Sequence, residues 1–346
     1  MGHRSDQTPF DLEALPTWLD SLPGATRGEV TLHRLGAGQS NLTYCATDGV
    51  GHSIVLRRPP RGSLASSAHD VAREGRIMSA LSSTNVPVPG ILGIHETPNF
   101  TDVPVVAMEM VAGEAVTSPA VAERITPDVR RVIAENLIEV MARIHEVNLD
   151  EVGLSVLSSH DPYAPRQLRR WSTQWERTKT RESSALDALT ERLWDAIPEQ
   201  DTTTLVHGDL HLGNVMCNLD TGEVTAVVDW ELATLGAPLA DVGSLRAYWP
   251  ERGGLVLPGF EAGCADGFPT GEELAQMYLQ RTGRDPQALD FWYVLGLWKV
   301  AIIAEGVVRR VQEMPSNAAP TGAPTVAMVD QLVDYATATA DAINLA

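Results

Sequence analysis

The most informative stretch of this 346-residue chain is Leu205-Val206-His207-Gly208-Asp209-Leu210-His211-Leu212-Gly213-Asn214-Val215. It places Asp209 and Asn214 five positions apart in a polar loop between apolar, strand-like flanks. Phosphoryl transfer needs a carboxylate that orients an acceptor hydroxyl or takes its proton, and a carbonyl ligand for Mg²⁺ on the phosphate side. One short loop of this spacing can hold both groups. The alternative is an ordinary turn that happens to collect these polar residues.

A second carboxylate, Asp229, follows Asn214 by fifteen positions and comes directly after the apolar run Val224 to Val228. A carboxylate at the end of a buried strand can reach into a cleft. The order and distance match the kinase Asp that binds Mg²⁺ bridging the phosphates. For the tripeptide Asp229-Trp230-Glu231 taken alone, the alternative is that Asp229 caps a helix. We therefore predict that Asp209, Asn214 and Asp229 are catalytic, and that Asn214 and Asp229 are the metal ligands.

The chain outside this region predicts an α+β protein with a kinase-like, bilobal fold. Its length favours two lobes over a single core. Alternating patterns and turn residues indicate a small antiparallel sheet with one helix, followed by helical periodicity from about Thr126. We expect a nucleotide-binding lobe over residues 1–112, a hinge over 108–113 and a catalytic, substrate-binding lobe over 113–346. The expected strands are 29–35, 41–47, 53–58, 90–96 and 103–111; the expected helices are 66–82, 126–145, 165–179, 184–197, 239–248, 271–282, 286–311 and 326–344.

The first lobe should supply a cation for the phosphates and a carboxylate that holds this cation. Alternation along the strand 53–58 puts Val55 and Arg57 on one face, where Val55 would line a nucleotide pocket. Glu74 lies on the apolar stripe of the following helix, and a carboxylate there needs a partner. We expect Arg57 to be that partner, with Arg58 as the fallback. The alternative is that Glu74 reaches solvent at the edge of the helix.

Two further segments are candidates for nucleotide contacts. Gly36, Gly38 and Ser40 join two expected strands, where glycines let backbone N–H groups approach phosphates closely, although a plain hairpin turn explains them as well. Met108 would be the residue beside the adenine, and the Glu109 carbonyl and the Val111 amide would pair with the adenine edge. A generic edge strand is the alternative for this segment.

The composition narrows the class of protein. Hydrophobic residues make up 44% of the chain and charged residues 21%, which is typical of a soluble enzyme. A net charge of −19 argues against a nucleic-acid partner. We see no apolar run near the roughly 20 residues that span a bilayer and no signal-peptide core, so we expect a cytoplasmic monomer or homodimer without a membrane partner. The three separated cysteines suit a reducing compartment.

Taken together, these motifs resemble the aminoglycoside phosphotransferase and choline kinase-like family over nearly the whole chain. The segments 55–60, 87–89, 170–175 and 229–241 are similar to the phosphotransferase domain of acyl-CoA dehydrogenase family members 10 and 11. The resemblance implies ATP and Mg²⁺ as cofactors, a small hydroxyl-bearing acceptor such as a hydroxyacyl-CoA, and an Arg at position 57 where other relatives carry Lys. Ala237 departs from the Asp that is common in this branch.

Several alternatives remain at this point. An aminoglycoside or amino-alcohol kinase is compatible with the motifs, and so is a nucleotide-binding pseudokinase or regulatory module. Trp171 and Trp175, four apart on a helix, indicate core packing more than a binding surface. We expect His145 to be structural and His207 to brace the catalytic loop by hydrogen bonding. Asp241 would act in a similar supporting way.

Overall fold

The computed structural model describes residues 10–36, 41–60, 70–96, 101, 103–157, 162–199, 202–251, 253–315 and 322–345. The chain forms two compact units, one of residues 1–112 and 226–232, and the other of residues 113–225 and 233–346. The segment that carries Asp229 therefore belongs to the first unit, although it lies far along the sequence. The functional division into a nucleotide lobe and a catalytic lobe at residue 112 stays a prediction.

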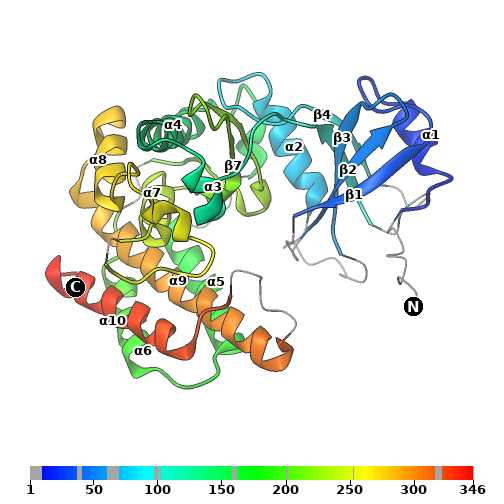
Figure 1. Ribbon diagram of the computed structural model, residues 1–346. Helices are drawn as coiled ribbons and strands as arrows, with labels where there is room; N and C mark the ends of the chain where they lie inside the picture. The colour runs from blue at the N-terminus through cyan, green and yellow to red at the C-terminus, as the bar shows by residue number, and fades with distance from the viewer. Residues whose placement is uncertain are drawn as a thin grey trace. The chain divides into compact units, whose positions relative to one another are not determined.

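The first unit contains a five-stranded sheet of order β1-β2-β3-β5-β4, in which every neighbouring pair is antiparallel (Figure 1). The predicted antiparallel sheet is thus confirmed. A shift of register between Ile91 and Gly93 interrupts the pairing of the last two strands. The strands are β1 Val30–Leu35, β2 Leu42–Asp48, β3 Ser53–Arg58, β4 Ile91–His95 and β5 Val105–Glu109.

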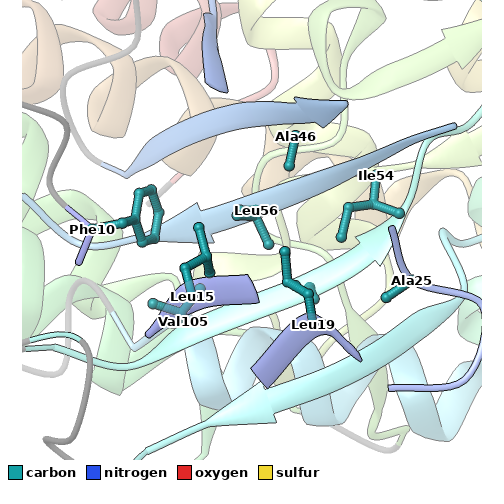
Figure 2. Close-up of a cluster of buried hydrophobic side chains, with 9 residues drawn as sticks. Phe10, Leu15, Leu19, Ala25, Ala46, Ile54, Leu56 and Val105 are labelled. Atoms are coloured by element: carbon teal, nitrogen blue, oxygen red, sulfur yellow. The ribbon is translucent and has the colours of Figure 1, made fainter. Parts of the chain in front are cut away.

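The two faces of this sheet have different partners. Ile54 and Leu56 of β3 pack with Leu15 and Leu19 of α1 (Leu15–Asp20) in a buried apolar cluster, which Figure 2 shows. Because side chains alternate along a strand, the intervening positions of β3 face the other side. There the second helix, α2 (Val71–Leu81), packs against β4 and β5. The alternation therefore presents Arg57 to α2.

The second unit is mainly helical, as predicted (Figure 1). Two short sheets complete it: β6 (Thr204–Val206) pairs with β9 (Thr234–Gly236), and β7 (Val215–Cys217) pairs with β8 (Val224–Val227), the strand that leads back to the first unit. The helices are α3 Pro119–Glu123, α4 Pro127–His145, α5 Tyr163–Thr178, α6 Ser184–Asp195, α7 Leu239–Tyr248, α8 Gly271–Thr282, α9 Gln287–Glu313 and α10 Val326–Ala342.

The helices α7 and α9 approach each other at two glycines. A Cβ added at Gly243 would lie 2.2 Å from the carbonyl oxygen of Trp292, and one added at Gly296 would lie 2.6 Å from the carbonyl oxygen of Gly243. These distances are far inside van der Waals contact, so any side chain at either position would push the helices apart. The close crossing fixes the position of Asp241 on α7 relative to Lys299 on α9.

The helix α9 is the segment that bears on the expectation of no membrane-spanning run. Among the described residues it is the single helix long and apolar enough, by length and composition, to cross a membrane. Within its most apolar window, however, 89% of the residues are buried inside the structure. Such burial identifies α9 as the core helix of the second unit, packed between α5, α7 and α10.

Candidate active site

The loop after β6 brings Asp209 and Asn214 together. The Asn214 side-chain amide donates to the backbone carbonyl of Asp209 at 2.7 Å and to its carboxylate oxygen Oδ2 at 3.2 Å. Asn214 is the last residue of a short 3₁₀ turn, η3 (Leu212–Asn214), and Asp209 precedes this turn. Since the Asn214 nitrogen faces Asp209, its carbonyl oxygen Oδ1 is left without a partner among the described residues. The loop therefore presents one carboxylate and one free amide oxygen.

Asp241, at the start of α7, holds the beginning of this loop. Its carboxylate accepts the backbone N–H groups of His207 at 2.7 Å and Gly208 at 2.8 Å. His145, the last residue of α4, donates to the same carboxylate at 3.2 Å, and its other ring nitrogen lies 2.6 Å from the Tyr278 hydroxyl. Gly208 adopts φ 83°, a left-handed conformation in which glycine is unstrained. The buried Asp241 carboxylate thus holds the start of the loop through two backbone hydrogen bonds.

His207 and His211 stabilise the same loop. The His207 ring nitrogen Nδ1 accepts the backbone N–H of Asp209 at 3.3 Å, and His207 is fully buried. This contact agrees with the bracing position expected for His207. His211 accepts the Gly213 N–H at 3.0 Å, and its Nε2 lies 3.6 Å from Asp209 Oδ2. His211 therefore lies beside the Asp209 carboxylate, while His207 holds the Asp209 backbone.

The electrostatic surroundings keep Asp209 ionised. Burial by itself would raise its pKa, but the hydrogen bond and charge of His211, with the charges of Lys299 and His207, hold the pKa of Asp209 below its usual value. A carboxylate that is ionised near neutral pH can orient a hydroxyl and accept its hydrogen bond. This is the role expected of the acidic residue in phosphoryl transfer.

Lys299 belongs to this cluster, and the motif search missed it. Its ammonium donates to the carbonyl of Gly208 at 3.0 Å, and the side chain is buried. The contact spans 91 positions of sequence, so no local pattern reveals it. One signal was available, because only two of the 26 Lys and Arg residues in the chain are lysines. A lysine inside an apolar helix of such an arginine-rich chain is a candidate functional residue.

In the first unit, Arg57 lies between two carboxylates. Its Nε donates to Glu74 at 2.9 Å, and its Nη2 donates to Asp229 at 2.6 Å. The backbone N–H of Trp230 also donates to Glu74, at 3.2 Å. Glu74 is 2% exposed, so it does not reach solvent at the helix edge. The ion pair expected between Arg57 and Glu74 is present.

Arg58 is placed differently. It is fully buried, donates to the carbonyl of Pro59 at 3.1 Å, and lies 5.6 Å from the ring centre of Phe10. Because side chains alternate along β3, Arg58 points to the apolar face of the sheet, away from Arg57. Of the two arginines, Arg57 is therefore the one that pairs with Glu74.

Asp229 has an unusual backbone. Its φ is 66°, in the left-handed region that non-glycine residues seldom occupy and that Asp tolerates better than most. Such conformations cost energy and are concentrated at functional sites. Its Oδ1 binds Arg57, while no described residue contacts Oδ2. Asp229 therefore offers a carboxylate oxygen of the kind that Mg²⁺ takes as a ligand, and Asn214 in the second unit offers an amide oxygen of the same class.

The remaining nucleotide candidates are only partly described. Gly36 ends β1 with φ 69°, whereas Gly38 and Ser40 lie outside the described residues. Val55 lies on the same face of β3 as Arg57, and Met108 is buried in β5. The Glu109 amide donates to the Gly90 carbonyl at 2.8 Å. Among the described residues, the Val111 amide has no hydrogen-bond partner.

The sequence of this chain matches a known protein family and several known proteins. The model of the phosphotransferase enzyme family matches residues 31–292. The chain belongs to this family. It is 35% identical over 94% of its length to acyl-CoA dehydrogenase family member 10 of Mus musculus, and 32% identical over 88% to family member 11 of Rattus norvegicus. The chain spans only 31% and 40% of these two relatives.

Solved structures agree on the fold of this phosphotransferase. A protein from Ralstonia eutropha, assigned to the aminoglycoside phosphotransferases, matches with a TM-score of 0.76 and 29% identity, covering 95% of this chain and 99% of that one. A thermostable mutant of aminoglycoside phosphotransferase APH(4)-Ia, in complex with ADP and hygromycin B, matches with a TM-score of 0.59 and 18% identity, covering 96% and 97%. The kinase-like α+β fold expected from the sequence is confirmed.

The phosphotransferase also has an apolar pocket beside its catalytic loop. The pocket is small and partly open to solvent. Tyr248 and Phe260 form its aromatic wall, with stacked rings 4.7 Å apart, and the His211 ring meets Phe260 edge-on at 5.1 Å. Burial, and next the charge of Asp209, raise the pKa of Tyr248. The pocket therefore lies within electrostatic reach of Asp209, and sequence spacing did not predict it.

Glu74 gives this phosphotransferase a testable pH response. Burial raises its pKa to about 7, against the opposing effect of Arg57; the charge of Asp229 raises it further. Above this pKa the Glu74 carboxylate is ionised and holds Arg57 by a charged hydrogen bond. Below it the carboxyl is protonated and neutral, while Arg57 keeps its charge. One pH unit above this value, we expect the wild type to bind ADP with Mg²⁺ about tenfold more tightly than Glu74→Gln. One unit below, the two affinities should converge.

Isothermal titration at several pH values measures this difference. The phosphates of ADP titrate equally in both experiments, so only the ratio of the two affinities reports on Glu74. Glu29→Gln, which changes an exposed carboxylate of the same unit, is the matched control and should bind like the wild type at every pH. If the ratio of the wild-type and Glu74→Gln affinities stays constant at every pH, ionisation of Glu74 does not control nucleotide binding.

Proposed function

We propose that this chain transfers the γ-phosphate of ATP to a hydroxyl group of a small acceptor. The observation that carries the proposal is the pairing of Asp209 with Asn214 in one braced loop, with the acid ionised and an amide oxygen free. In this reaction Asp209 orients the acceptor hydroxyl and takes its proton as the O–P bond forms. ADP leaves with the electrons of the broken bond.

The proposed roles of the other residues follow from their contacts. Asn214 and Asp229 would hold Mg²⁺, which when bound neutralises charge on the phosphates. Arg57, oriented by Glu74, would contact the phosphates in place of the usual lysine. Met108 and Val55 would line the base, and the unpartnered Val111 amide and the Glu109 carbonyl would pair with the adenine edge. Gly36, Gly38 and Ser40 stay candidates for the phosphate loop.

The acceptor is the finer part of the proposal. The pocket beside His211 is lined by apolar and aromatic side chains, and its lining includes no Asp or Glu. An aminoglycoside carries several ammonium groups and is poorly matched by such walls. An acceptor with an apolar chain fits better, and a hydroxyacyl-CoA, implied by the resemblance to family members 10 and 11, is of this kind. We therefore place the hydroxyacyl part of the acceptor in this pocket.

An acceptor panel tests the proposal. Release of ADP from Mg²⁺ and ATP is measured with hydroxyacyl-CoAs, aminoglycosides and choline in parallel, and phosphate incorporation is checked by mass spectrometry. We expect turnover with hydroxyacyl-CoAs and none above background with choline. Turnover with aminoglycosides alone would contradict the proposal that the acceptor is a hydroxyacyl-CoA. Nucleotide binding without any turnover would instead support a nucleotide-binding regulatory module.

The setting of the protein is also a proposal. We propose a cytoplasmic monomer or homodimer that acts without nucleic acid or membrane. The burial of α9 and the net charge of −19 support this setting, because the apolar helix is covered and no cationic surplus is available for phosphate backbones. Sedimentation of the purified chain with and without anionic vesicles measures both its mass and its membrane affinity.

A further inference from the structure

A second pocket of the second unit includes Lys299, whose ammonium reaches the Gly208 carbonyl of the loop that carries Asp209. It is partly open to solvent and is formed by side chains of α5, α7 and α9. Its polar lining consists of Gln167, Ser244 and Lys299, together with the phenol of Tyr163. Trp171 and Trp292 form aromatic walls. The pocket therefore combines flat apolar surfaces with a small set of polar groups, as binding sites for small molecules commonly do.

Lys299 is the charged group of this pocket. An ammonium has three N–H donors, and one of them binds the Gly208 carbonyl at 3.0 Å. Lys299 is 8% exposed and makes no other hydrogen bond in the described part of the chain. Its Nζ lies 5.4 Å from the ring centre of Trp171. Two donors of a buried cation are thus available to a ligand, and a buried donor left unpaired is costly.

The other polar groups of the pocket are also donors. The Gln167 oxygen accepts the Trp171 indole N–H at 3.2 Å, which leaves the Gln167 amide nitrogen as a donor. The Ser244 hydroxyl has no hydrogen-bond partner among the described residues. No Asp or Glu lines the pocket. Although the chain has a net charge of −19, this group of donors around one ammonium is complementary to a negatively charged ligand.

The charges around Lys299 support the same conclusion. Burial lowers its pKa, the carboxylates of Asp209 and Asp241 raise it, and the charge of Arg170 lowers it. Both carboxylates are engaged elsewhere: Asp241 binds the backbone of His207 and Gly208, and Asp209 lies beside Asn214. An anion in the pocket would offset the desolvation of the ammonium from the open side.

We propose that this pocket binds a small anionic group, a carboxylate or a phosphoryl group, through the Lys299 ammonium, the Ser244 hydroxyl and the Gln167 amide. The anion either is part of the acceptor or is a separate ligand. In the first case the inference rests on the proposed function and adds a requirement to it. The acceptor would have to carry a negative group that reaches the Lys299 ammonium. Lys299 then links ligand binding to the residue that precedes Asp209.

The chain itself supplies a direct probe. With only Lys179 and Lys299 present, selective ¹³Cε-lysine labelling gives two NMR signals, and Lys179→Arg identifies which is which. The labelled full-length protein is titrated with acetate and with inorganic phosphate at constant ionic strength. We expect the Lys299 signal to shift saturably while the Lys179 signal stays in place. Choline chloride, a cation of similar size, should shift neither. The measurement needs no ATP and no turnover, so its failure is distinct from failure of the proposed kinase activity.

A matched pair of variants tests the location. Gln167→Glu puts a negative charge into the pocket without removing Lys299, and we expect it to weaken anion binding more than tenfold. Gln174→Glu adds the same charge to the same helix about two turns away, roughly 10 Å along the axis, and should have a smaller effect. A Lys299 signal that no anion moves would overturn the proposal. So would equal shifts with choline, or equal effects of the two variants.

The source of the anion is found with paired acceptors. A hydroxycarboxylic acid and its methyl ester are compared in the ADP-release assay. If the KM of the acid is at least tenfold lower, and Gln167→Glu removes this preference, the anion belongs to the acceptor. If acid and ester are used alike while acetate or phosphate shifts Lys299, the pocket binds a separate anion. Either result supports the anion site.

Discussion

Replacing Asp209 with Asn is expected to lower kcat by about 10²–10⁴ while leaving nucleotide affinity unchanged. The amide keeps the size of the side chain but can neither take the proton of the acceptor hydroxyl nor hold that hydroxyl by a charged hydrogen bond. The environment keeps this carboxylate ionised, so the loss should be present throughout the neutral range. Acceptor-dependent ADP release gives kcat, and isothermal titration gives the nucleotide affinity.

Asp220→Asn is the control for this experiment. Asp220 is exposed in the turn between β7 and β8, in the same unit, and its carboxylate makes no hydrogen bond or ion pair with a described residue. Its substitution makes the same change of charge without touching the loop. A kcat of Asp209→Asn within a few-fold of this control would remove Asp209 from the mechanism, whatever the acceptor is.

The second large effect is expected at Asp241. Its carboxylate is 1% exposed and accepts two backbone N–H groups and an imidazole N–H. Although burial would raise its pKa, the hydrogen bond and charge of His145 and the charge of His207 hold the pKa of Asp241 below its usual value. Asp241→Asn turns an NH₂ group towards donors and removes the charge. We expect a loss of about 3–5 kcal/mol in the free energy of unfolding, as when one partner of a buried charged network is removed.

Urea unfolding followed by tryptophan fluorescence measures this loss. Asp195→Asn, on an exposed position of α6, is the control and should unfold like the wild type. A loss below about 1 kcal/mol would indicate that the loop does not depend on Asp241. If the variant does not fold, hydrogen exchange of the His207 and Gly208 amides in the wild type gives the same information, because amides held by a buried carboxylate should exchange slowly.

Much of the architecture was predictable from local patterns. Alternation along β3 placed Arg57 opposite Ile54 and Leu56, and helical periodicity placed Glu74 on the buried stripe of α2; these two rules together give the Arg57–Glu74 pair. The loop spacing gave Asp209 and Asn214. Such inferences succeed because a strand or helix repeats its geometry over a few residues, so sequence spacing converts directly into a shared face.

The parts that escaped prediction depend on distant contacts. Lys299 reaches Gly208 only because α7 and α9 touch at Gly243 and Gly296, and no short motif encodes that crossing. The aromatic wall of Tyr248 and Phe260 likewise joins a helix end to a later loop. The burial of α9 could not be predicted for a related reason, since apolar composition does not tell whether lipid or protein covers a helix.

The return of residues 226–232 to the first unit has a consequence for biosynthesis. Arg57 and Glu74 are translated early, but Asp229 and the Trp230 amide, which complete their contacts, are translated only after residues 113–225. At roughly 5–20 residues per second, the ribosome needs about 6–23 s to supply them. During that interval a buried carboxylate and a guanidinium lack part of their final coordination. We therefore expect the nascent first unit to complete these contacts only when the second unit is nearly half made.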